Sequence, residues 1–160
     1  MRQMKKTARR RPAQWALEVF DKAPYVTVSM IRPDGTPYGL PLSLVRSDES
    51  TFYFHCAPEG EKIDCIRANP MVSLSAVSRC TPRYEEEKGN FTEYYHSAIA
   101  LGRASEVTDR TEKTEALRLI CRRFLPGYMN HFDEAVNRSI DRTAIVRIDL
   151  TEPPVGKCKP

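Results

Sequence analysis

Three short segments rich in β-branched and aromatic residues follow one another along the chain and are separated by turn sequences. The segments cover residues 25–31, 38–46 and 51–56. Between them lie Pro-Asp-Gly-Thr at residues 33–36 and Ser-Asp-Glu-Ser at residues 47–50, both typical of tight turns. Two hairpins in succession predict an antiparallel meander, unlike the strand-helix alternation of a parallel sheet.

Further strand patterns continue from this meander to the end of the chain. The sequence predicts a strand at residues 71–77 and a long extended segment at 94–107, in which Gly102 marks a bulge or a bend. The charge-rich residues 82–90 between them are interpreted as a solvated connection, with a lid as the alternative. A last strand is expected at residues 143–150. Because a closed sheet needs a long bent strand, these patterns favour a barrel.

Helical patterns lie beside these strands. Pro12 suits the first turn of a helix, and the apolar residues after it form one stripe. Asp109 with Glu112 three positions later resembles a capping box and precedes the most regular apolar periodicity of the chain. The expected helices cover residues 12–22, 61–68, 109–125 and 132–139, the last of them the weakest.

The length and the charge distribution fit one domain with a basic N-terminal segment. A chain of 160 residues can bury roughly two-thirds of the surface that its unfolded form exposes. The formal charge is +4, but six of the 25 Lys and Arg lie in the first eleven residues, which contain no acid. The other 19 basic residues stand against 21 acidic ones. We therefore expect a basic tail at 1–11, a slightly acidic domain at 12–152 and a C-terminal tail at 153–160.

The composition also argues against several partners and sites. A slightly acidic body offers no broad nucleic-acid face, and the basic tail is interpreted as solvated, with contact to an anionic surface as the alternative. Five scattered cysteines without a Cys-x-x-Cys pair, and only three histidines, predict neither a disulfide framework nor a metal site. No apolar run has the length of a signal peptide or a membrane span, so a cytoplasmic location is expected.

Residues 53–70 read as a strand that passes through a tight polar loop into a short helix. Pro58 and Gly60 punctuate the loop, and Lys62 falls in the first helical turn. The first amides of a helix lack backbone partners and its dipole favours negative charge, so amides and ammonium together predict a phosphate seat. The alternative is that Lys62 is an ordinary exposed helix lysine.

Four segments of the chain occur in a characteristic order and spacing. They are residues 38–43 (Tyr-Gly-Leu-Pro-Leu-Ser), 55–70, 97–104 (Ser-Ala-Ile-Ala-Leu-Gly-Arg-Ala), and 143–149 followed by Gly156-Lys157. Together they resemble the FMN-binding split-barrel proteins, and within them the pyridoxamine-phosphate-oxidase-like group that includes the 5-nitroimidazole reductases. The resemblance implies a mainly β (α+β) fold, an antiparallel six-stranded split β-barrel with flanking helices. It also implies one FMN per subunit and a homodimer with FMN at the subunit interface.

The resemblance further implies roles for individual residues. Lys62 is expected to hold the FMN phosphate, His55 to act in catalysis near the reacting edge of the flavin, and Ser97 to add a hydrogen bond to the phosphate. The expected cofactor-binding set is Leu40, Pro41, Leu42, Ser43, His55, Cys56, Ala57, Lys62, Ile63 and Ser97, with no metal ligand. The structural alternatives are a half-buried histidine bonded to a carbonyl, a buried barrel strand at 40–43 and a surface serine.

The implied activity is two-electron transfer from reduced FMN to a small acceptor such as a nitroaromatic. The chain lacks a Gly-x-Gly-x-x-Gly sequence, so NAD(P)H is expected only as a transient donor. It also lacks the Gly-x-Ser-x-Gly elbow of a hydrolase. Three alternatives remain. The first is a non-catalytic flavin- or tetrapyrrole-binding or sensing module. The second is a pyridoxamine-phosphate oxidase proper, which needs further basic residues for the substrate phosphate and an Arg-x-His-type pattern that is missing near Arg147. The third is an interaction protein with a vestigial pocket.

Overall fold

A computed structural model of the chain describes residues 4–160, so Arg2 of the predicted basic tail lies outside the described residues. Mostly antiparallel strands and four α-helices confirm the α+β fold class. The strands are β1 (Arg10–Arg11), β2 (Val26–Ile31), β3 (Pro37–Leu42), β4 (Val45–Arg46), β5 (Thr51–Cys56), β6 (Met71–Glu85), β7 (Asn90–Glu106), β8 (Ala144–Leu150) and β9 (Val155–Lys159). The α-helices are α1 (Ala13–Lys22), α2 (Glu61–Ala68), α3 (Arg110–Phe124) and α4 (Phe132–Ser139). Short 3-10 helices are η1 (Thr7–Arg9), η2 (Glu86–Lys88), η3 (Pro126–His131) and η4 (Ile140–Arg142).

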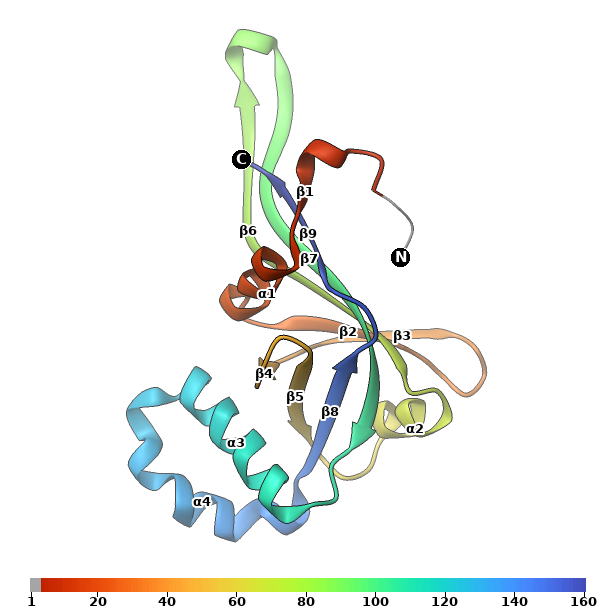
Figure 1. Cartoon of the computed structure of the whole chain (residues 1–160), viewed down its shortest axis with the longest axis vertical. Coiled ribbons are helices and arrows are strands. Elements are labelled where there is room, and N and C mark those ends of the chain that lie inside the picture. The colour runs from red at the N-terminus through yellow and green to blue at the C-terminus, as the bar shows by residue number, and fades with distance from the viewer. Residues whose placement is uncertain (1–3) are drawn as a thin grey trace.

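The described strands form one curled sheet that does not close (Figure 1). Seven of them follow the order β3-β2-β6-β7-β8-β5-β4, and every pair is antiparallel. β3 and β4 stand at the two ends of this path, as in a split barrel. The predicted strand at 38–46 is divided between them because β3 pairs with β2 whereas β4 pairs with β5.

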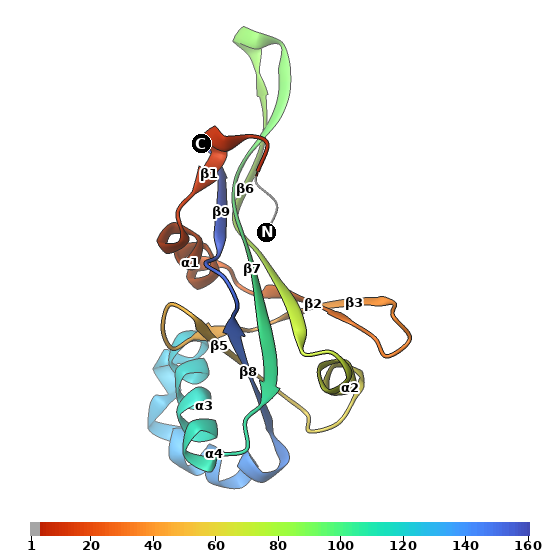
Figure 2. The same ribbon diagram turned by 45° about the vertical axis from the view of Figure 1, so that its right-hand side comes forward.

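Residues 82–90, predicted to be a solvated connection, are almost all exposed, but they form the end of a hairpin: residues 82–85 and 90 are strand, and residues 86–89 form the turn. β6 continues to Glu85 and pairs with β7 up to Asn90, so that the two strands form a long arm that projects from the body (Figure 2). Pro82 lies opposite Glu93 in this ladder. The other edge of β6 has no partner strand in the described chain at this point, and proline fits such an edge strand when its nitrogen faces away from the paired neighbour.

Gly102 marks neither a bulge nor an interruption of pairing. It lies opposite Val72 in β6 and opposite Leu150 in β8, and the irregularity of the β6–β7 ladder falls between Val77 and Arg79 instead. A Cβ atom at Gly102 would lie 2.6 Å from Cγ2 of Ile148. Glycine is therefore required for the close approach of β7 and β8.

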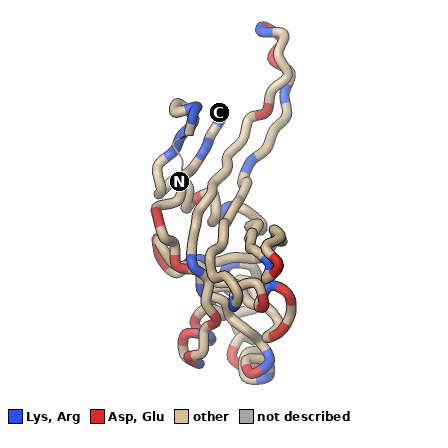
Figure 3. The backbone as a smooth tube through the Cα atoms, turned by 90° about the vertical axis from the view of Figure 1, so that its right-hand side faces the viewer, with Lys and Arg blue, Asp and Glu red and all other residues tan. Residues whose placement is uncertain are grey.

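Both predicted tails take part in the sheet. β9 pairs with β7 along residues 155–159, and β1 pairs with β9, which brings Arg10 opposite Lys157. Figure 3 shows the Lys and Arg residues of the two chain ends close together. Gly156 allows this packing, since a Cβ atom there would lie 2.5 Å from the Trp15 ring. The segments at the two chain ends are too short to show a recognisable strand pattern. They form strands because each pairs with a strand that is distant in the sequence.

Two apolar clusters hold the domain together. The larger fills the curled sheet beneath α1 and α2, and the smaller lies between α3, α4 and the outer side of β5 and β8. β5 contributes to both by alternation: Phe52 and Phe54 belong to the first cluster and Tyr53 to the second. The predicted cap of α3 is half present, since Asp109 accepts a hydrogen bond from the Glu112 amide (2.7 Å) while the Glu112 carboxylate binds Tyr53.

Candidate functional site

The loop after β5 delivers the chain into α2 as predicted. Gly60 precedes the helix with φ of +123°, and its carbonyl accepts from the amides of Ile63 (2.9 Å) and Asp64 (3.1 Å). No side chain caps this helix end, so the amides of Glu61 and Lys62 face outward without a capping oxygen. Lys62 is half-buried beside them. An uncapped helix start beside an ammonium group is an arrangement that binds anions.

A second cation, which the sequence did not reveal, lies at this helix start. Arg32 follows β2 and forms an ion pair with Glu61, and this hydrogen bond raises the pKa of the Arg32 guanidinium. The same guanidinium lies 4.8 Å from the centre of the Tyr38 ring in β3. Arg32 therefore neutralises one acid of the first helical turn and shows that α2 begins beside β3, the strand that carries residues 40–42.

Cys56 connects this helix start with the end of β7. The thiol is half-buried, and burial raises its pKa while the Lys62 ammonium acts in the opposite direction. The Glu106 carboxylate also raises it, and Glu106 is itself held by two hydrogen bonds from Arg67, of 2.6 and 2.9 Å. Ala57, the next residue, is exposed. Lys62 and Cys56 thus lie close to each other, and Ala57 follows Cys56 in the loop.

His55 and Ile63 occupy different surroundings from Lys62. Strand alternation places the exposed His55 on the face of β5 that Tyr53 shares, whereas Cys56 turns to the other face. In the ladder His55 lies opposite Ile145. Ile63 is fully buried and anchors α2 in the core. Its amide donates a hydrogen bond to the Gly60 carbonyl and is not available to a ligand. Within one chain, the predicted catalytic imidazole of His55 and the Cys56 thiol therefore lie on opposite faces of the sheet.

The residues 40–43 lie on an edge of the sheet. β3 pairs with β2 alone in the described chain, and Pro41 stands opposite Thr27. Leu40 and Leu42 turn their half-buried side chains to the large cluster, while Pro41 and Ser43 are exposed. The edge position explains how a proline fits within the strand, and it leaves backbone groups of β3 available to a ligand.

Ser97 lies elsewhere in the same chain. Its hydroxyl donates to the Lys157 carbonyl at 3.5 Å, in the part of β7 that pairs with β9. It lies six positions before Arg103, which is opposite Met71, three residues after the end of α2. At a rise of about 3.3 Å per residue this is roughly 20 Å of strand. A single chain therefore does not bring Ser97 to Lys62.

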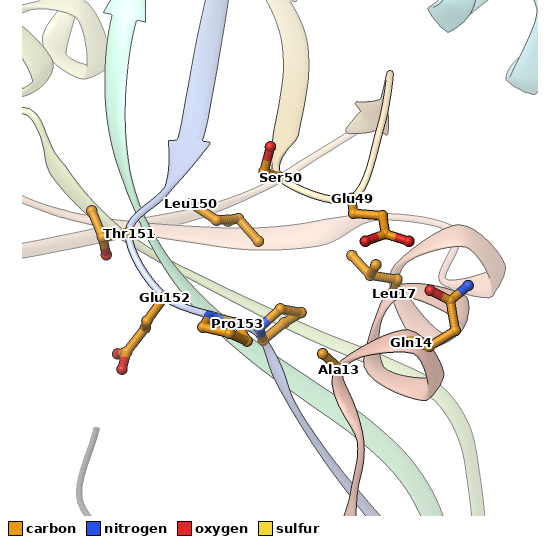
Figure 4. Close-up of a pocket in the computed structure, with 10 residues that line it drawn as sticks. Ala13, Gln14, Leu17, Glu49, Ser50, Leu150, Thr151, Glu152 and Pro153 are labelled. Atoms are coloured by element: carbon orange, nitrogen blue, oxygen red, sulfur yellow. The ribbon is translucent and has the colours of Figure 1, made fainter.

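A pocket of about 600 Å³ lies away from all of the predicted residues (Figure 4). It opens between the start of α1, the turn before β5 and the link from β8 to β9. Leu17, Leu150 and Pro153 give it apolar walls, and Gln14 and Glu49 bring polar groups. Its lining residues come from three segments that are distant in the sequence, so no local motif predicts this pocket.

Residues 4–160 contain neither a cluster of metal ligands nor a helix that could cross a membrane. All five cysteines in this range are free thiols, and no three His, Cys, Asp or Glu side chains there are grouped to hold a metal ion. No helix in the described range combines the length and the apolar character that crossing a bilayer demands.

The fold is shared with several solved structures. A candidate 5-nitroimidazole antibiotic resistance protein of Bacteroides thetaiotaomicron matches with a TM-score of 0.76 and 23% identity, over 90% of this chain and 82% of the other. The flavocytochrome Anf3 of Azotobacter vinelandii matches with a TM-score of 0.83 and 19% identity, over 99% of this chain and 72% of the other. An FAD and heme binding protein of Mycobacterium smegmatis matches with a TM-score of 0.80 and 16% identity, over 94% of this chain and 73% of the other. At these identities the likeness establishes the fold alone.

The sequence comparisons address the family directly. The search of curated proteins gives no match. A family model described as pyridoxamine 5'-phosphate oxidase matches residues 12–155, nearly the whole chain, and the motifs at residues 38–43, 55–70 and 97–104 lie within that range. The chain therefore belongs to the pyridoxamine 5'-phosphate oxidase family, as the order of those motifs predicts.

Proposed function

We propose that this protein binds FMN and transfers two electrons to a small acceptor such as a nitroaromatic. The observation that carries the proposal is the start of α2, where Gly60 leaves the first amides uncapped beside the half-buried Lys62. Charge-assisted hydrogen bonds from an ammonium group and helix-start amides suit a terminal phosphate. The family membership makes the phosphate of a flavin the natural ligand of this seat.

The rest of the proposed flavin site extends from this seat along β3. Arg32 links Glu61 to Tyr38, so the phosphate seat adjoins the edge strand whose backbone at residues 40–43 is available for ring contacts. Cys56 and Ala57 border the seat on the β5 side. When bound, FMN supplies the two-electron chemistry, and the protein holds it, excludes water and places hydrogen bonds at the ring.

His55 is proposed as the proton donor on the strength of the family resemblance. Its side chain is exposed and forms no hydrogen bond or ion pair with another described residue, so it is available to a ligand. An imidazole is suited to proton transfer near neutral pH. Because His55 and Cys56 turn to opposite faces of β5, the substrate would have to approach the end of this strand from the His55 side.

We also propose that the protein forms a homodimer through the outer face of β2, β3, β6 and β7. The middle of this face is uncharged: the ten residues that share it there by their register are Thr27, Ser29, Gly39, Pro41, Ser73, Ser75, Val77, Ser97, Ile99 and Leu101. The charged residues Arg103, opposite Met71, and Lys157, opposite Ser97, border it. Ile99 is 44% exposed and Val77 50%. Interface cores are depleted in charged residues. Such a dimer supplies Ser97 from the partner subunit, which one chain cannot bring to Lys62.

A second candidate is a non-catalytic module that binds flavin or heme. The flavocytochrome of Azotobacter vinelandii and the FAD and heme binding protein of Mycobacterium smegmatis share the fold, and the exposed His55 is available as an iron ligand. Addition of hemin separates the two candidates, because a His-ligated heme shows a shifted Soret band that His55→Ala would abolish. Turnover of a nitroaromatic with NADH or NADPH would favour the enzyme.

The decisive test compares FMN with riboflavin, which lacks the phosphate. Lys62→Ala should weaken FMN binding about 10- to 100-fold, since a hydrogen bond to a charged group contributes roughly 1.5–3 kcal/mol, and should leave riboflavin binding unchanged. Lys88→Ala, an exposed lysine on the arm, is the matched control and should change neither affinity. If the wild type binds no flavin, the function proposed here fails. If Lys62→Ala binds FMN as tightly as the wild type, only the phosphate assignment fails.

A further inference from the structure

The tip of the β6–β7 arm carries an aromatic pair that its own chain does not cover. Phe91 is 86% exposed and Tyr84 is 49% exposed, and their ring centres lie 4.7 Å apart. Residues 79–84 are all exposed, so this part of the ribbon has no buried face. A two-stranded hairpin without a covered face is marginally stable in water. The tip therefore has the character of a surface that packs against another molecule.

An apolar pocket of about 230 Å³ lies at the opposite end of the molecule, between α3 and α4. Its lining is mainly apolar: Leu117, Cys121, Leu125, Tyr128, Phe132 and Val136. Leu125 is 54% exposed at its rim, and Tyr128 is 66% exposed. Burial raises the pKa of the Cys121 thiol, which therefore stays neutral. A dry cavity of about 150 Å³ can hold benzene, so this pocket has room for a phenyl ring.

The geometry points to a second copy of the chain as the source of that ring. The arm tip and the α3–α4 pair lie at opposite ends of the long axis in both views, so the tip cannot reach the pocket of its own chain (Figures 1 and 2). A two-fold axis that crosses the long axis near its middle reverses the second chain. Each tip then lies at the helical end of the other protomer, which is the reciprocal contact of a two-fold dimer.

The charges at the two ends are complementary. The turn of the arm is η2 followed by Gly89, and its Lys88 forms an ion pair with Glu85 at the end of β6. Neither Glu86 nor Glu87 forms an ion pair with another described residue. Arg122 follows Cys121 at the pocket, is exposed, and likewise has no ion-pair partner in the described chain. Opposite charges around a buried contact favour the correct partner orientation.

We propose that each protomer inserts Phe91 of its arm into the α3–α4 pocket of the other protomer. This inference rests on the homodimer of the proposed function and adds a second contact region to the outer face. The exposed Val77 and Ile99, at the base of the arm, make the two regions continuous along β6 and β7. The arm then clasps the partner, and its tip gains the apolar cover that it lacks in one chain.

Cross-linking of the FMN-loaded full chain tests the contact. Phe91→Cys is combined with Cys80→Ser, which removes the exposed thiol of the arm, and the protein is oxidised with copper phenanthroline. We expect a disulfide between the introduced thiol and Cys121 of the other protomer, seen as a covalent dimer and lost when Cys121→Ser is added. Thr81→Cys in the same background is the control and should give no link to Cys121, because it lies about 10 Å farther down the arm.

The outcomes separate this inference from the function beneath it. A flavin-loaded dimer without the Cys121 link overturns the arm contact and leaves the flavin site intact. A flavin-loaded monomer overturns the dimer and the arm contact together, whereas a linked dimer that binds no flavin supports the arm contact and overturns the function. As a second measurement, Phe91→Ser should raise the dimer dissociation constant about 10-fold or more in sedimentation experiments, since buried aromatic anchors dominate interfaces. An unchanged constant contradicts the insertion.

Discussion

Arg123 holds the end of α1 from a position about 100 residues later in the chain, and its removal should be costly. The guanidinium donates to the carbonyls of Phe20 (2.8 Å), Asp21 (2.9 Å), Ala23 (2.8 Å) and Leu44 (2.7 Å). The first three carbonyls lie in or just after the last turn of α1, where helix carbonyls lack intrahelical partners and where a cation also meets the negative end of the helix dipole.

The expected loss follows from the number of protons available. Nη2 has two hydrogens for three carbonyls, so its three bonds are shared, and with the Nη1 bond to Leu44 they amount to about two strong bonds. A hydrogen bond to a charged group contributes roughly 1.5–3 kcal/mol. Arg123→Ala should therefore lower the free energy of unfolding by about 3–6 kcal/mol, or lower Tm by about 6–24 °C for a chain of this size.

Urea denaturation followed by fluorescence measures this loss, because Trp15 is the only tryptophan and lies in α1 itself. Arg142→Ala, which removes an exposed arginine that forms no hydrogen bond or ion pair with α1 in the described chain, is the matched control and should cost less than about 0.5 kcal/mol. Arg123→Lys keeps the charge but not the planar fork, so it should restore only part of the stability. A loss below about 1 kcal/mol for Arg123→Ala, or full rescue by lysine, would refute this reasoning.

Two further changes test close packing and charge. Gly102→Ala should cost about 1–3 kcal/mol in chemical denaturation, since its Cβ would meet Ile148 at 2.6 Å, whereas Gly127→Ala has open space and should be near neutral. Burial alone would raise the pKa of Asp48, but hydrogen bonds, chiefly from Ser50, lower it to about 2 from an ordinary 3.8. The ionised carboxylate therefore stabilises the fold above about pH 4, and this contribution disappears as the pH falls toward 2. Asp48→Asn should be less stable than the wild type by about 1 kcal/mol at pH 7, a modest value because the group is largely exposed, and equal to it near pH 2.

The sequence predicted those elements that local chemistry determines. The helices α1 and α3 follow from apolar stripes and from Pro12 and Asp109, which stand immediately before them. α2 begins at Glu61 because Gly60 alone adopts the positive φ that the loop requires. Such residues determine the conformation of the chain only within a few positions of themselves, so the sequence alone is sufficient to predict these elements.

Contacts between distant segments could not be predicted in the same way. β9 exists because β7 offers it an edge, and Arg32 reaches α2 only because β2 packs against that helix. Pro82 signals a break of pairing when the sequence is considered alone, yet the break is harmless on an unpaired edge. Each of these features depends on which strand lies next to which, and that information is absent from local patterns.

The positions of the predicted site residues give the strongest argument for a site shared between subunits. Within one chain, Lys62 and the edge strand β3 adjoin through Arg32, but Ser97 lies roughly 20 Å of strand from the end of α2. Ser97 does lie on the outer face that we propose to be the dimer interface, as Pro41 does. A two-fold axis through that face would therefore let residues of both chains contact the flavin that we propose.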